Sequence, residues 1–135
     1  MNWLTSFASS TIARKNLLLQ LEALLDAYYE RGEQLELGVP TVNYCADQLN
    51  LSANYFGDLI KLETGLPAKT HIQNWIIARA IHKVVCSTYT VSEISYLLGF
   101  NYPQHFCRFF KNKVGHTPVA FRKQYTTEDV TASAR

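Results

Sequence analysis

The sequence predicts an all-α fold. Apolar residues recur three and four positions apart along most of the 135-residue chain, which is the spacing of one face of a helix. No segment alternates apolar and polar residues between tight turns for long enough to indicate a strand. Glycine, proline and N-capping residues separate the apolar stretches, so we expect a series of distinct helices.

The N-terminal part is expected to form three helices. The first runs over about Thr11–Arg31 and ends at Gly32, and a short helix follows over residues 41–49. Ser52 is the expected N-cap of the third helix, which ends at Gly65. The apolar residues that define these helices are Leu17, Leu21, Leu24, Leu25, Tyr28, Val42, Cys45, Ala46, Leu49, Tyr55, Phe56, Leu59, Ile60 and Leu62.

A long helix is expected next, over residues 68–87. Its candidates for burial are Ile72, Trp75, Ile76, Ala80 and Val84. Thr90 is the expected N-cap of a short helix, and Gly99 stands where that helix needs a left-handed residue to end. The apolar residues of the short helix are Val91, Ile94, Leu97 and Leu98.

Two more helices complete the expected fold. Asn101 is the expected N-cap of a helix that starts at Pro103, where a first turn has no use for the missing N–H donor. Thr117 is expected to cap a last helix with Pro118 at its first position, and residues 126–135 form a polar tail. The apolar stripe of the helix from Pro103 consists of Phe106, Phe109, Phe110 and Val114.

Two stretches of the chain have the same design. One is TVNYCADQLNLSANYFGDLIKLETG, from Thr41, and the other is TVSEISYLLGFNYPQHFCRFFKNKVG, from Thr90. Each consists of Thr-Val, a short helix ending in Leu, a turn, an aromatic-bearing helix and a Gly. This order is typical of a helix-turn-helix, which places its second helix in the major groove of DNA. Two such units in tandem favour DNA binding over an ordinary helical bundle.

The charge distribution favours the same function. Residues 1–66 carry four Lys or Arg against eight Asp or Glu, whereas residues 67–135 carry nine against three. Residues 101–123 contain five basic side chains and no acidic one. The basic half of the chain, residues 67–135, fits a polyanionic partner, although charge alone is equally consistent with a solvated basic face.

Composition and spacing argue against several other classes. Three unclustered cysteines indicate a reducing compartment rather than a disulfide framework, and four scattered histidines without a CxxC spacing argue against a metal site. No apolar run is long enough for a membrane span. Paired carboxylates, a nucleophile elbow and a phosphate loop are absent from the sequence, so we expect neither enzymatic activity nor a cofactor.

Particular residues of both stretches stand at a family's spacing. In the second stretch and just beyond it they are Gly99, Phe100, Phe106, Arg108, Phe110, Lys111, Gly115, Thr117, Pro118, Phe121 and Arg122. In the first they are Ala46, Leu49, Leu51, Ser52, Tyr55, Phe56, Ile60, Lys61, Thr64 and Gly65. At these positions the chain resembles the DNA-binding domain of the AraC/XylS family of bacterial transcription regulators, over about residues 15–125.

The resemblance implies two homeodomain-like, AraC-type helix-turn-helix subdomains joined by a long, rigid linker helix. It places the first helix-turn-helix at about residues 41–64, the linker helix at about 68–87 and the second helix-turn-helix at about 90–114. Residues 1–14 are then an N-terminal extension or linker remnant, ahead of the DNA-binding domain, and residues 126–135 are the polar tail. The two recognition helices are expected in successive major grooves, about 34 to 36 Å apart.

The resemblance also implies partners and a location. The expected partners are double-stranded DNA and RNA polymerase, at the nucleoid in the bacterial cytoplasm, with no membrane involved. Members usually carry a sensor or dimerisation domain ahead of this one, so the chain is either a single-domain regulator or a fragment. Trp3, Leu4 and Phe7 then either contact that missing domain or fold back on the first helix.

The candidate DNA contacts sort by chemistry. Gln104, His105 and Arg108 are candidates for base edges, because Arg pairs well with guanine and Gln with adenine. Cys107 either meets a thymine methyl group or packs in the core, and Arg122 is expected to hold the last helix through a buried pair. The candidates for phosphate contacts are Asn101, Tyr102, Lys111 and Lys113. In the first unit the residues expected to face the groove are Ala53, Asn54, Gly57, Asp58 and Lys61.

Some residues depart from the family's pattern. Ile76 stands where the linker helix usually has a basic residue, and His71 replaces a common Tyr. Gly57 and Asp58 stand where the first recognition helix usually has longer or basic side chains. With the acidic first unit, they motivate an alternative: a helical protein-interaction module that has lost DNA binding. Salt dependence distinguishes the two, because phosphate contacts weaken steeply with added salt.

Overall fold

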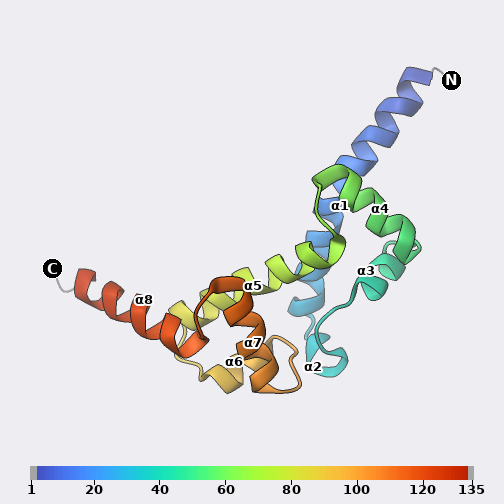
Figure 1. Cartoon of the computed structure of the whole chain (residues 1–135). Coiled ribbons are helices and arrows are strands. Elements are labelled where there is room, and N and C mark those ends of the chain that lie inside the picture. Colours follow the sequence, from blue (N-terminus) through green and yellow to red (C-terminus); the bar gives the residue numbers. More distant parts are fainter. Residues whose placement is uncertain (1–2, 134–135) are drawn as a thin grey trace. The chain divides into compact units, whose positions relative to one another are not determined.

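The computed structural model describes the backbone of residues 3–133 and the side chains of residues 16–125. Over these residues it forms eight helices and no strand, which confirms the all-α prediction (Figure 1). The helices are α1 (Trp3–Glu30), α2 (Gln34–Leu37), α3 (Val42–Gln48), α4 (Ala53–Thr64), α5 (Ala68–Cys86), α6 (Val91–Leu97), α7 (Pro103–Val114) and α8 (Pro118–Ser133). No helix in the described part of the chain is long and apolar enough to cross a membrane.

The chain divides into two compact units. Unit 1 comprises residues 1–31 and 40–75, and unit 2 comprises residues 32–39 and 76–135. Unit 1 therefore contains α1, α3, α4 and the first part of α5. Unit 2 contains α2, the rest of α5, α6, α7 and α8. Each unit holds one of the two stretches of repeated design.

The core of unit 1 is built on a stripe of α1, against which α4 packs (Figure 1). The ring of Tyr28 on α1 meets the ring of Tyr44 on α3 edge to face, with 5.1 Å between centroids. Burial of one large apolar side chain contributes about 1.5 to 3 kcal/mol, so packing rather than helix propensity stabilises these helices. The buried apolar residues of unit 1 are Leu17, Leu21, Leu25, Tyr28, Cys45, Ala46, Phe56, Ile60, Ala68 and Ile72.

The core of unit 2 is rich in phenylalanine. α7 packs against α6 and α8 (Figure 1), and its Phe106 and Phe110 are fully buried. Phe100 meets Phe106 edge to face at 5.4 Å, and Phe121 meets Phe110 in the same way at 5.5 Å. The other buried apolar residues of unit 2 include Ile76, Ala80, Val84, Ile94 and Leu98.

Side-chain caps fix where four of the helices begin. Each cap oxygen accepts a hydrogen bond from the backbone N–H three residues further on, at 3.0 to 3.2 Å. The caps are Thr41, Ser52, Thr90 and Thr117. At their C-terminal ends α4 and α7 stop at left-handed glycines, Gly65 with φ 80° and Gly115 with φ 94°. The predicted caps at Ser52, Thr90 and Thr117 are thus confirmed.

Two predicted helix boundaries and one predicted N-cap are wrong. α1 begins at Trp3 rather than near Thr11, and α8 continues to Ser133 through the predicted polar tail. The N-cap of α7 is Tyr102 rather than Asn101, and Tyr102 makes no side-chain cap hydrogen bond. Pro103 explains this, because the residue before a proline is held in an extended conformation. The side chains of Trp3, Leu4 and Phe7 lie outside the described residues.

Two apolar residues predicted to define α4 lie on its surface instead. The side chain of Tyr55 is 56% exposed and that of Leu62 is 69% exposed. The buried positions of this helix are Phe56 and Ile60, four residues apart, so only one narrow stripe faces the core.

α2 is missing from the prediction, because its causes are distant in sequence. The Nε2 of Gln34 donates a hydrogen bond to the carbonyl of Leu97 at 3.0 Å, which holds α2 against α6. A Cβ on Gly99 would lie 2.9 Å from the carbonyl carbon of Gly38. Only glycine therefore allows these two loops to approach each other.

Arg122 has the structural role that was predicted for it. Its Nε donates to the carbonyl of Val84 at 2.8 Å, and its Nη2 lies 3.5 Å and 3.4 Å from the carbonyls of Lys83 and Ser87. The side chain thus binds the C-terminal end of α5 and joins it to α8. Its partners are backbone carbonyls rather than the oppositely charged side chain that a buried pair implies.

Candidate nucleic-acid interface

The second helices of the two motifs have the same backbone plan. α4 and α7 are both twelve residues long, and their first residues lie fifty positions apart. The N–H of Gly65 bonds the carbonyl of Lys61, and the N–H of Gly115 bonds the carbonyl of Lys111, both at 2.8 Å. Each residue of α4 therefore has a counterpart in α7 that is fifty positions later.

Burial follows the same register. Phe56 and Phe106 are both fully buried, and so are Ile60 and Phe110. Ala68 and Pro118 are also buried at matching positions after the two helices. The residues between these positions consequently form matching outer faces, which differ only in their side chains.

The outer face of α7 carries basic and amide side chains. The candidate contacts on or just before this helix are exposed, with the exception of Cys107. The exposed candidates are Asn101, Tyr102, Gln104, His105, Arg108, Lys111 and Lys113. The rings of Tyr102 and His105 meet edge to face at 5.3 Å. Cys107 is half-buried on the same helix. Donors for phosphates and base edges thus share one helix surface.

The outer face of α4 is acidic and partly apolar. Asn54, Asp58 and Lys61 are exposed, whereas Ala53 and Gly57 are half-buried. A Cβ at Gly57 would meet no atom within 4 Å, so glycine is not required there by packing. The exposed apolar residues of this region are Tyr55, Leu62 and Leu66.

Matched positions show how the two faces differ. Asp58 stands where α7 has Arg108, and the half-buried Glu63 stands where α7 has the exposed Lys113. Leu62 corresponds to Asn112 in the same way. Only the lysines at 61 and 111 keep the same charge. Phosphates therefore attract the surface of unit 2 more strongly than that of unit 1.

A basic groove on α5 was missed from the sequence. It belongs to unit 2, has a volume of about 310 Å³ and is lined by Ala78, Arg79, His82 and Lys83. The Nζ of Lys83 also lies 6.0 Å from the centroid of the Tyr89 ring. Positions 79, 82 and 83 share a helix face at intervals of three and four, and this spacing is the signal that finds them.

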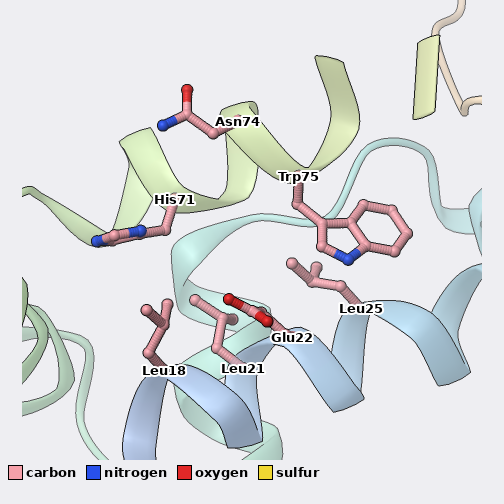
Figure 2. A pocket seen from close by; sticks show the side chains of 7 residues that line it. All are labelled: Leu18, Leu21, Glu22, Leu25, His71, Asn74 and Trp75. Carbon is pink, nitrogen blue, oxygen red and sulfur yellow. The ribbon is translucent and has the colours of Figure 1, made fainter. Parts of the chain in front are cut away.

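A groove of about 310 Å³ in unit 1 has a different lining (Figure 2). Leu18, Leu21 and Leu25 of α1 form its apolar floor, and Trp75 of α5 covers one end. Glu22 and His71 add polar groups, whereas Asn74 points away at the rim. This groove has no Lys or Arg in its lining, and its one fully charged side chain, Glu22, is acidic.

The departures at His71 and Ile76 are accommodated by packing. The Nε2 of His71 lies 2.7 Å from Oγ1 of Thr64, which also donates to the carbonyl of Ile60 at 2.8 Å. His71 therefore ties the end of α4 to α5 within unit 1. Ile76 is only 1% exposed and forms part of the core of unit 2.

The cysteines and histidines of the described residues form no metal site. No group of three or more His, Cys, Asp or Glu side chains in that part of the chain is placed to hold a metal ion. Burial raises the pKa of the Cys45 thiol to about 11, which leaves it protonated and unreactive at neutral pH. Cys45 is thus a small packing residue of α3.

The described geometry agrees with a known protein family. A family model described as "Helix-turn-helix domain" matches residues 45–124, which is more than half of the chain. The chain belongs to the AraC-type helix-turn-helix family. It is therefore a DNA-binding domain of the kind found in transcription regulators. The resemblance seen in the sequence is confirmed.

Individual relatives are more distant. The chain is 28% identical over 121 residues to the Msm operon regulatory protein of Streptococcus mutans. The aligned region covers 90% of this chain and 41% of that protein. The DNA-binding domain of AdpA, solved in complex with a target DNA, is 20% identical with a TM-score of 0.66, over 80% of this chain and 94% of that one. A DNA-binding transcriptional dual regulator from Escherichia coli K-12 is 14% identical with a TM-score of 0.68, over 83% and 94%. The two structures share the fold with this chain.

Proposed function

We propose that the chain regulates transcription by binding a specific duplex sequence with α4 and α7 in successive major grooves. The observation that carries this proposal is the outer face of α7, where Gln104, Arg108 and Lys111 are exposed on a helix of groove-fitting length. Residues 101–123 include no acidic side chain to oppose phosphates.

The proposed roles in unit 2 follow from chemistry and exposure. Arg108 reads guanine and Gln104 reads adenine, because their donors and acceptors match those edges in the major groove. His105 lies beside them as a weaker base or phosphate contact. The residues proposed to hold phosphates are Asn101, Tyr102, Lys111 and Lys113, to which the α5 groove adds Arg79, His82 and Lys83.

Unit 1 is proposed to contribute less affinity. Of its candidates, Asn54, Asp58 and Lys61 are exposed on α4. Lys61 is the one basic side chain of residues 41–64, against Asp47, Asp58 and Glu63. Contacts by Ala53 and Gly57 are limited to their backbone and a methyl group.

Further partners are proposed on the basis of the family and of length. The chain spans less than half of the Streptococcus mutans regulator, so a sensor or dimerisation domain is proposed to act with it. RNA polymerase is the proposed target of regulation, in the bacterial cytoplasm. The domain is proposed to act by binding alone, without catalysis or a cofactor.

A protein-interaction module without DNA binding is the second candidate. The observation that favours it is the apolar and acidic outer face of α4, with Tyr55, Leu62 and Leu66 exposed. The two candidates differ in their response to salt, because an apolar interface does not release counterions.

A selection of bound sequences from random duplexes, followed by a salt titration, tests the proposal. We expect an enriched sequence, and an affinity whose logarithm falls with log salt at a slope of about −4 to −6, as for roughly four to seven phosphate contacts. A flat salt response, or no enrichment at low salt, would favour the second candidate.

A further inference from the structure

The register between α4 and α7 allows a base to be assigned to unit 1. Position 58 and position 108 occupy the same place on helices of equal length, with buried apolar residues at the corresponding positions and a left-handed glycine at each C-terminal cap. Both side chains are exposed. If each helix lies in the major groove in the same way, these two residues reach the same base pair of their own half-site.

The two side chains have opposite hydrogen-bonding character. The guanidinium of Arg108 has only donors, which suit the O6 and N7 acceptors of guanine. The carboxylate of Asp58 has only acceptors, which suit the N4 amino donor of cytosine. Guanine pairs with cytosine, so the two residues suit the same base pair in its two orientations.

We propose that Asp58 is a specificity-determining residue that selects cytosine at the place in the first half-site where Arg108 selects guanine in the second. This inference rests on the proposed function, since it requires that both helices read DNA. Asn54 and Gln104 are both exposed amides at the second position of their helices, so each half-site has adenine at the neighbouring place. When each half-site is written in the direction in which its own recognition helix reads it, both half-sites contain adenine at one place. At the other place the first half-site has cytosine where the second has guanine.

Asp58 acts more by rejection than by added affinity. When guanine occupies this place, the carboxylate oxygens of Asp58 face its O6 and N7 acceptors and are repelled by them. Guanine is therefore disfavoured at this place. The same charge is repelled by the phosphates on either side of the groove, which offsets the gain from the cytosine contact. Loss of the carboxylate is therefore expected to change base preference while leaving affinity for the selected sequence nearly the same.

The neighbouring side chains leave this assignment to Asp58. Gly57 supplies no side chain, and a Cβ there would have open space around it. Lys61 lies one turn further along the helix, at the position where Lys111 is proposed to hold a phosphate. Among the exposed side chains of α4, Asp58 is the one acidic group with the register of a base-reading residue.

The experiment measures affinity for duplexes that carry every single-base change of the selected sequence. For the unchanged chain we expect cytosine to be preferred over guanine roughly tenfold at one place in the first half-site, as for one good base contact. Asp58→Arg is expected to move that preference to guanine, and Asp58→Asn, which is nearly the same size, to move it to adenine. Arg108→Asp is expected to move the preference in the second half-site from guanine to cytosine. Circular dichroism of each variant checks that the helices are retained.

Asp47→Asn is the matched control. It removes one exposed negative charge from unit 1, at α3 rather than α4, so affinity for all duplexes is expected to rise alike with no change in base preference.

The outcomes separate this inference from the function on which it rests. Enrichment of guanine at the base that Asp58 is proposed to read would overturn the cytosine assignment alone. Asp58 variants that change affinity without changing base preference would do the same. Failure of the unchanged chain to bind any duplex would overturn the proposed function and this inference with it. A change of preference by Asp58→Asn confirms the assignment even where Asp58→Arg fails to fold.

Discussion

α4 and α7 share a backbone plan and differ in what they present to solvent. Both helices end at a left-handed glycine. α4 buries Phe56 and Ile60, and α7 buries Phe106 and Phe110 at the matching positions. On the outer face, however, Arg108 and Asn112 of α7 are replaced in α4 by Asp58 and Leu62. The fold therefore depends on a few buried and capping positions, while function depends on exposed positions that the fold leaves free.

The same contrast extends to the grooves of the two units. In unit 2 the groove on α5 is lined by basic side chains, whereas in unit 1 the groove of Figure 2 has a leucine floor. The proposed preference of DNA for unit 2 therefore has two separate sources, α7 and α5.

The largest effect is expected from the two matched phenylalanines. Phe56→Ala and Phe106→Ala each remove a fully buried ring, so each is expected to lower the free energy of unfolding by about 3 to 5 kcal/mol. Urea unfolding followed by circular dichroism measures both. A loss below about 1 kcal/mol for either variant would contradict the idea of a shared scaffold.

Arg122 should show where the scaffolds differ. Its counterpart fifty positions earlier is Ile72, a buried apolar residue. Arg122→Met removes charged hydrogen bonds to the carbonyls at the end of α5, and is expected to cost about 1.5 to 3 kcal/mol of stability. For the folded protein that remains, the dependence of log DNA affinity on log salt should be unchanged. A dependence that is less steep by about one unit would instead indicate that Arg122 contacts a phosphate.

The N-caps of the two motifs should have similar, smaller effects. Ser52→Ala and Thr90→Ala each remove one cap hydrogen bond, and each is expected to cost about 1 kcal/mol. Thermal unfolding of the two variants beside the unchanged chain measures this. Ser52→Gly and Thr90→Gly serve as controls, because glycine is a tolerated N-cap and should cost less.

The matched lysines test the surfaces with the smallest expected effect. Lys111→Ala should weaken binding to all sequences alike and reduce the salt slope by about one unit. Lys61→Ala should have a weaker effect, because unit 1 is proposed to contribute less affinity. Titrations with specific and random duplexes at several salt concentrations measure both; an equal reduction of slope would show that both helices hold phosphates alike.

The sequence predicts the parts of this fold that depend on near neighbours. The caps at Ser52, Thr90 and Thr117 act over three residues, and the stripe of Phe106 and Phe110 follows from helical spacing. α2 was missed because it is held by Leu97, sixty-three residues from Gln34. The carbonyl partners of Arg122 were missed for the same reason, since they lie 35 to 39 residues away.

The candidate site was predictable to a similar degree. Helical spacing and charge were enough to select Gln104, Arg108 and Lys111, and each of these is exposed. Spacing did not reveal that Tyr55 and Leu62 face solvent, because an apolar residue beside a buried stripe looks like part of it in the sequence. The basic face of α5 also follows helical spacing, since Arg79, His82 and Lys83 lie three and four positions apart.

Unit 2 is proposed to dominate binding to DNA, in large part because α4 and α7 differ at positions 58 and 108. The most direct measurement is footprinting of Arg108→Ala and Asp58→Ala on one selected duplex. We predict that Arg108→Ala weakens protection by about 1 to 3 kcal/mol, whereas Asp58→Ala leaves protection unchanged or improved. A loss of protection from Asp58→Ala as large as that from Arg108→Ala would contradict the account.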